Sequence, residues 1–191
     1  MRSLWVASLL LLTAFQQLAA RTYHELTELD AVFDRHGVTG TFVLFDPARD
    51  RMEISNRLRA QQRFPKLSDG NRAAADVLDR FWLDGPLAIS AIEQTEFLAR
   101  LVARKVPVTE AAVRAVETGT LVEKTSRYEL HGRAGRLVNP KRQIGWWVGW
   151  VVRDGKYYPF ALNLDLFSDA DAAKPIAIGR ACLKALGKLE R

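Results

Sequence analysis

The chain has 191 residues, of which 26% are charged, a formal net charge of +6 and a single cysteine, Cys182. This length suits one domain with a hydrophobic core of its own, and one cysteine excludes an intramolecular disulfide. Lysine and arginine are scattered along the chain without interleaved aromatic residues, which argues against a nucleic-acid partner. We therefore expect a basic, solvated surface.

Residues 1–20 predict a secretory signal peptide. Arg2 gives a basic start, the run from Leu4 to Phe15 is apolar, and the small residues Ala19 and Ala20 precede Arg21. The apolar run is short for a bilayer, and no later segment reaches spanning length, so we expect no stable membrane span. The remainder, residues 21–191, is predicted to be one domain.

The first predicted element is a β-hairpin near the start of this domain. Thr41 to Phe45 is β-branched and aromatic, and Arg51 to Ser55 alternates apolar and polar residues. Between them, Pro47 and Asp50 are typical turn residues.

Helices are predicted to follow. Ser90 and Glu93 have the spacing of a capping box, and Ile92, Phe97, Leu98 and Leu101 then share one helical face. A shorter helix is expected over residues 109–117.

A second hairpin and a closing helix complete the predicted fold. Ile144 to Val152 and Tyr157 to Leu166 flank an Asp-Gly turn, and Pro159 suggests that the second strand lies at an edge or contains a bulge. The last helix is predicted from Pro175 to about Leu186, with Cys182 on its apolar face. This order predicts an α+β fold, in which terminal and central helices cover an antiparallel sheet.

The chain offers no metal site by sequence. His24, His36 and His131 are far apart, and none has a second ligand at metal-binding spacing. We predict neither a metal nor another cofactor.

Four segments carry a resemblance to a known family. They are GTFVLFD at 40–46, DRFWLDGPLAIS at 79–90, EQTEFL at 93–98 and IGWWVGWVV at 144–152. Together they resemble the class D serine β-lactamases, the oxacillin-hydrolysing type of the penicillin-binding superfamily. The resemblance implies a periplasmic enzyme whose ligands are β-lactams or peptidoglycan-like molecules. It also implies a nucleophilic serine in an S-x-x-K motif, with S-x-V, Y-G-N and K-T-G motifs lining the pocket, because a serine hydroxyl needs a base to activate it.

The chain lacks the motif that carries this chemistry. No serine or threonine has a lysine three residues later. At 63–71 the sequence RFPKLSDGN joins two stretches that a long helical segment separates in the family. We therefore predict an internal deletion at 65–66 that removes the nucleophile, its lysine and the S-x-V motif.

The surviving motifs are altered. Asp69 replaces the tyrosine of Y-G-N and leaves Asn71 as its remnant, and H-G-K-T-G reads His131, Gly132, Arg133, Ala134 and Gly135. Arginine keeps the positive charge that could pair with a substrate carboxylate, whereas alanine has no hydroxyl to donate. The second carboxylate-binding cation of the family falls at Lys174 or Pro175, and Trp82, near the catalytic lysine in the family, is expected to serve packing.

Three hypotheses follow, and they leave open whether the chain is an enzyme. The first is a non-catalytic homologue that still binds a β-lactam through Arg133. The second is residual activity with Ser68 as a replacement nucleophile, although Lys66 lies only two residues away and not the three or four that share a helical face. The third is an envelope interaction module. Loss of a helical lobe would also uncover apolar surface, so a homodimer or aggregation is expected.

Overall fold

The computed structural model describes residues 22–65, 88–139 and 142–190. The predicted signal peptide, the Lys66 side of the junction and the candidate site residues Ser68, Asn71 and Trp82 lie outside these ranges. In the described ranges, no helix is both long enough and apolar enough to cross a bilayer.

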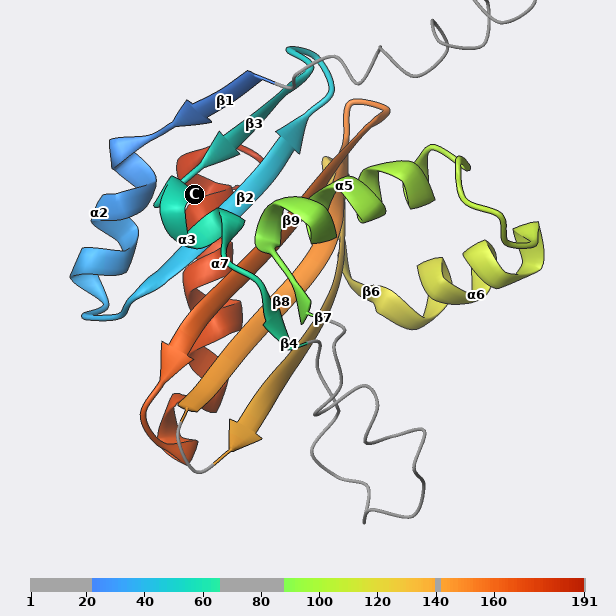
Figure 1. Ribbon diagram of the computed structural model, residues 1–191. Coiled ribbons are helices and arrows are strands. Elements are labelled where there is room, and N and C mark those ends of the chain that lie inside the picture. Colours follow the sequence, from blue (N-terminus) through green and yellow to red (C-terminus); the bar gives the residue numbers. More distant parts are fainter. Residues whose placement is uncertain (1–21, 66–87, 140–141, 191) are drawn as a thin grey trace, which may run out of the picture.

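One sheet dominates the molecule (Figure 1). Its seven strands lie in the order β1-β3-β2-β9-β8-β7-β6, and every neighbouring pair is antiparallel except β1 and β3. The strands are β1 (Thr22–Glu25), β2 (Gly40–Asp46), β3 (Arg51–Ile54), β6 (Leu121–Lys124), β7 (Tyr128–Asn139), β8 (Arg142–Arg153) and β9 (Lys156–Leu166). A separate two-stranded ladder joins β4 (Phe64–Pro65) to β5 (Ala88–Ile89).

Helices cover both faces of this sheet. They are α2 (Thr27–Arg35), α3 (Arg57–Gln61), α5 (Ala91–Val102), α6 (Glu110–Thr120) and α7 (Lys174–Ala185), and the 3-10 helix η2 (Asp169–Ala173) precedes α7. Figure 1 shows α7 behind the sheet and α3 and α5 in front of it. The α+β prediction is therefore confirmed.

Each face has its own hydrophobic core, which the alternation of strand side chains explains. Trp147, Phe160 and Ile178 belong to the core under α2 and α7, which we call the α7 face. Trp146 and Ile92 belong to the core under α3 and α5, which we call the α5 face. Burial of apolar side chains on both sides makes the central strands the most protected part of the molecule.

The two hairpins form where the sequence predicted them. The β8–β9 turn consists of Asp154 and Gly155, both with positive φ, which is the geometry that Asp-Gly favours in a two-residue hairpin. The predicted capping box also forms, because the Glu93 N–H donates to Ser90 Oγ (3.1 Å) while the Ser90 N–H donates to the Glu93 carboxylate (2.9 Å). The shorter helix and the closing helix appear as α6 and α7.

The shared face predicted for Phe97 was wrong, whereas the edge position predicted for Pro159 holds for that residue alone. Strand β9 as a whole is central, since it pairs with both β2 and β8. The β2 ladder begins only at the next residue, Phe160, so the missing N–H of proline costs no bond on that side. Phe97 is 37% exposed and lies off the buried stripe of α5, whereas Ile92, Leu98 and Leu101 are buried as expected.

Candidate functional site

The candidate site is centred on the stretch His131–Gly135 of β7, which pairs in register with β8. Arg133 lies opposite Val148, and Gly135 lies opposite Trp146. Directly paired residues of an antiparallel sheet project to the same face, so Arg133 and Gly135 belong to the α5 face. Ala134 pairs with Trp147 and belongs to the α7 face.

The glycines of this stretch are required by close packing. Gly132 and Gly149 are directly opposed on β7 and β8. A Cβ on Gly149 would lie 2.0 Å from the His131 carbonyl oxygen, and one on Gly132 would lie 2.7 Å from Trp147 Nε1. The Trp147 ring also packs against Phe160 with centroids 4.6 Å apart. Gly132 therefore leaves room for the Trp147 indole, and Gly149 lets the backbones of β7 and β8 approach closely.

The outer edge of β7 is only partly covered. Strand β6 pairs with β7 from Glu129 to His131, and in the described ranges no strand pairs with that edge beyond His131. Arg133 and Ala134 are exposed there. The stretch that aligns with the family's K-T-G thus presents a cation to solvent at an open sheet edge.

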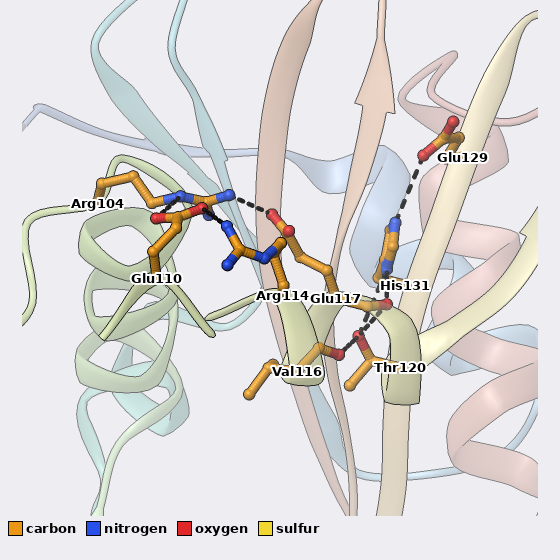
Figure 2. A network of polar contacts seen from close by, with 8 residues as sticks. All are labelled: Arg104, Glu110, Arg114, Val116, Glu117, Thr120, Glu129 and His131. Atoms are coloured by element: carbon orange, nitrogen blue, oxygen red, sulfur yellow. Dashed lines mark hydrogen bonds and ion pairs between the residues drawn. The ribbon is translucent and has the colours of Figure 1, made fainter. Parts of the chain in front are cut away.

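His131 lies between Glu129 and the end of α6 (Figure 2). Its ring is stacked on Trp150, with centroids 4.7 Å apart, and its side chain is buried. His131 Nδ1 lies 3.1 Å from the Glu117 carbonyl oxygen of α6, and Nε2 lies 3.7 Å from the Glu129 carboxylate. Because a carbonyl can only accept, Nδ1 is the donor, and the ring ties α6 to the sheet edge.

The same network continues along α6 (Figure 2). Arg104, just after α5, lies 2.8 Å from the Glu117 carboxylate and 3.3 Å from that of Glu110. Thr120 Oγ1 donates to the Val116 carbonyl oxygen at 2.7 Å. These contacts are largely exposed, so they orient α6 but contribute little to its stability.

Lys174 does not face Arg133. It begins α7, and its ammonium lies 2.7 Å from the Asp171 carboxylate. Asp171 also accepts hydrogen bonds from the backbone N–H groups of Phe167 and Ser168. The hydrogen bond from Lys174, together with these amides, lowers the pKa of Asp171 to about 2. Lys174 thus stabilises the start of α7.

The described serines lie in structural positions, namely hydrogen bonds to the backbone, a helix cap, a contact with Asp171 and a turn. Ser55 Oγ accepts from the Phe42 N–H (3.1 Å), Ser90 caps α5, and Ser168 lies 3.3 Å from the Asp171 carboxylate. Ser126 lies in the exposed turn between β6 and β7. None of these hydroxyl groups has a lysine partner that could act as the base for acyl transfer.

The remaining titratable groups offer little chemistry. Burial raises the pKa of the Cys182 thiol to about 12, as expected for a core cysteine. Across the described ranges, no three histidine, cysteine or acidic side chains gather as a metal ion would need.

The sequence did not reveal a buried cluster around Arg59 on the α5 face. The Arg59 guanidinium donates to Asn163 Oδ1 (2.9 Å) and to both Asp165 oxygens (2.9 and 3.1 Å), and it lies over the Phe64 ring. This cluster fastens α3 to β9. The available signal was the presence of Asn163 and Asp165 in an otherwise apolar strand.

Three buried donors on the α5 face have no acceptor among the described residues. They are Trp146 Nε1, Trp150 Nε1 and Asn163 Nδ2. Arg59 fixes the orientation of the Asn163 amide, because only the amide oxygen can accept its hydrogen bond. Unpaired buried donors are rare in native proteins, and here they concentrate on the face that carries Arg133.

Comparison with known proteins shows which proteins share this sequence and fold. No family model matches the chain. It is 39% identical over 97 residues to β-lactamase OXA-48 of Klebsiella pneumoniae, an alignment that covers 51% of this chain and 37% of that protein. It is 33% identical over 118 residues to β-lactamase OXA-10 of Pseudomonas aeruginosa, covering 59% and 44%.

A solved structure supports the fold assignment. The class D β-lactamase FUS-1 (OXA-85) of Fusobacterium nucleatum subsp. polymorphum superposes with a TM-score of 0.77 at 24% identity, covering 87% of this chain and 100% of that one. In sequence and in fold the chain is therefore similar to class D β-lactamases. It spans less than half the length of the curated relatives that it matches.

Proposed function

We propose that the chain is an exported class D β-lactamase scaffold that does not hydrolyse β-lactams. The observation that carries this proposal is that every described serine lies in a cap, a turn or a backbone hydrogen bond and lacks a lysine partner. The proposal includes a signal peptide at 1–20, a periplasmic location and a single domain with an internal deletion at 65–66.

The unpaired donors of the α5 face support the deletion. Trp146, Trp150 and Asn163 keep polar groups that need acceptors, as would remain after the loss of a segment that once supplied them. The strand pair β7–β8 does not depend on that segment, because Trp147 and α7 cover its other face.

We propose that the remaining activity is weak binding of a β-lactam or a peptidoglycan-like carboxylate at β7. Arg133 is exposed and keeps the cation of the family's motif, and its fork can pair with a carboxylate. Ala134 has no hydroxyl, so it contributes nothing to orient the ligand.

The experiment follows nitrocefin turnover by the purified protein, next to a Ser68→Ala variant and an active class D enzyme. No turnover above the uncatalysed rate is expected from either form. Turnover that disappears in Ser68→Ala would show a replacement nucleophile and overturn the proposal.

Binding is tested separately by titrating ampicillin into isotope-labelled protein and following the amides of β7. We expect saturable chemical-shift changes. The affinity for ampicillin should be about tenfold weaker in Arg133→Gln, because one charge-assisted pair is lost. Shifts that are identical in this variant would remove Arg133 from the binding site.

A further inference from the structure

A basic cleft on the α7 face lies on the opposite side of the sheet from Arg133. It has a volume of about 420 Å³. Its lining residues come from the β6–β7 turn, the end of β8 and the C-terminal end of α7, and they are Arg127, Arg153, Lys184, Ala185, Gly187, Leu189 and Glu190. Arg153 belongs to this face because Val151, two residues earlier on the strand, packs in the α7 core.

The charges of the cleft do not balance. Three cations, Arg127, Arg153 and Lys184, line it together with one acid, Glu190. Among the described residues, no carboxylate lies within ion-pair distance of the Lys184 ammonium. Lys188 does not add to the cleft, because its ammonium lies 3.8 Å from the Tyr158 ring centroid and 3.9 Å from Asp46. The lining therefore has an excess of two positive charges, and Asp154, which is outside the lining, lies 3.8 Å from Arg153 Nε.

The arginines of the cleft are loosely held compared with others in the same molecule. Arg127 Nε is 3.4 Å from the Glu190 carboxylate, and Arg153 Nη1 is 3.3 Å from the Lys188 carbonyl oxygen. In contrast, Arg59 makes two bonds of about 3 Å to Asp165. A guanidinium has five N–H donors, so most donors of Arg127 and Arg153 remain available to a ligand in the cleft.

We propose that this cleft binds the phosphate group of a larger molecule. A phosphate monoester carries a charge of about −1.5 to −2 at neutral pH, which matches the excess of the lining. Its oxygens accept paired hydrogen bonds from arginine forks, and a lysine serves as an additional point charge. The remaining volume accommodates the part of the ligand next to the phosphate. This site is independent of serine chemistry and of β-lactam binding.

The backbone prepares the cleft. Helix α7 ends at Ala185, and Gly187 follows with φ +66°, a conformation that suits glycine and turns the chain sharply. The Leu186 N–H donates to the Cys182 carbonyl oxygen at 3.0 Å, and the Gly187 N–H donates to the Lys184 carbonyl oxygen at 2.9 Å. The terminal carbonyls thus have partners, which reduces their repulsion of an anion.

The test titrates inorganic phosphate into isotope-labelled full-length protein at constant ionic strength. We expect saturable shifts of the backbone amides of Gly187, Leu189 and Glu190. A double variant, Arg127→Gln with Lys184→Gln, should weaken this binding by at least about tenfold, since two of three cations are lost. Both side chains are on the surface, and a thermal melt checks that the variant folds.

A matched control removes two cations elsewhere. Lys105→Gln with Arg114→Gln has the same net charge, and both positions are exposed and outside the cleft. Phosphate affinity within about twofold of the unaltered protein is expected for this control. Equal weakening in both double variants, or the absence of saturable shifts, would overturn the proposal.

Vesicles identify the source of the phosphate. Cosedimentation with vesicles that contain phosphatidic acid, whose headgroup is a phosphate monoester, but not with phosphatidylcholine vesicles, abolished by the cleft variant alone, would point to a lipid headgroup. Phosphate binding without cosedimentation would point to a soluble phosphorylated ligand. Both results support a phosphate site.

Discussion

At the scale of single residues, Asp171 shows how one carboxylate stabilises the junction of two helices. It accepts bonds from two backbone amides and pairs with Lys174, so one side chain fixes both η2 and the start of α7. Lys174 was predicted to be a remnant of the ligand-binding site. In the structure its ammonium pairs with the Asp171 carboxylate at the start of α7.

The low pKa of Asp171 predicts a specific pH dependence of stability. Its pKa is near 2 in the folded chain and ordinary, about 3.8, in the unfolded chain, so its stabilisation is complete above pH 4 to 5 and disappears as the pH falls through 2. Asp171→Asn should therefore destabilise the protein at pH 7 but not at pH 2, as measured by urea unfolding.

The control for this measurement is Asp154→Asn, since Asp154 is 85% exposed and asparagine tolerates its positive φ. This variant should show no comparable loss at pH 7. An Asp171→Asn difference that persists unchanged at pH 2 would contradict the role assigned to the carboxylate.

At the scale of elements, the β7–β8 pair depends on its opposed glycines. Gly149→Ala places a methyl group 2.0 Å from the His131 carbonyl oxygen, and backbone cannot move aside as a flexible side chain can. We expect the free energy of unfolding to fall by about 3 kcal/mol or more.

Gly119→Ala provides the contrast, because a Cβ at Gly119 in α6 would meet nothing within 4 Å. Its stability should be unchanged or raised by up to about 1 kcal/mol. Urea unfolding of the two variants checks both values, and equal stability of the two would refute the close-packing argument.

Helix α6 depends on His131. Its only buried side chain is Val113, and the His131 ring supplies the hydrogen bond to the Glu117 carbonyl oxygen. His131→Ala removes this bond and the stacking on Trp150, so local opening of α6 should become easier by about 2 kcal/mol.

Amide hydrogen exchange measures this opening directly. Exchange over residues 110–120 should accelerate in His131→Ala but not in His24→Ala, whose ring contacts Glu53 of β3. Unchanged exchange in α6 would mean that other contacts hold the helix.

The elements differ in how far the sequence predicted them. The first hairpin and α5 carry their own signals, namely turn residues and a capping box. Strand β7 lacks such a signal, because its alternation of apolar and polar residues stops at Gly132. The Trp147 ring of β8 occupies the space that a side chain at Gly132 would fill. The structure alone also revealed α2, which begins after Leu26 without a side-chain cap.

At the scale of the whole molecule, the exposed apolar side chains of α6 and β6 predict self-association. Val116 is 39%, Leu121 47% and Val122 52% exposed, and β6 is an edge strand. Edges and patches of this kind favour pairing with another chain. Sedimentation velocity should show concentration-dependent association that Val122→Lys reduces and Ile176→Lys on α7 does not. A monomer at all concentrations would contradict this expectation.

The site was predictable only where motifs survive in the sequence. The HGRAG and GWWVGW motifs lie on two strands that pair in the structure, whereas the Arg59 cluster and the basic cleft join residues far apart in the chain. Such sites depend on tertiary neighbours that periodicity and spacing do not encode.

The measurement that tests the account most directly is the intact mass of the folded protein after incubation with a penicillin. The account predicts an unchanged mass from a sample whose amide exchange confirms a folded sheet, because no serine in the sequence has a lysine three residues later and none of the described serines has a lysine partner to act as base. A mass increase equal to one penicillin would reveal a covalent acyl-enzyme and contradict the central claim, and the modified residue would identify the nucleophile.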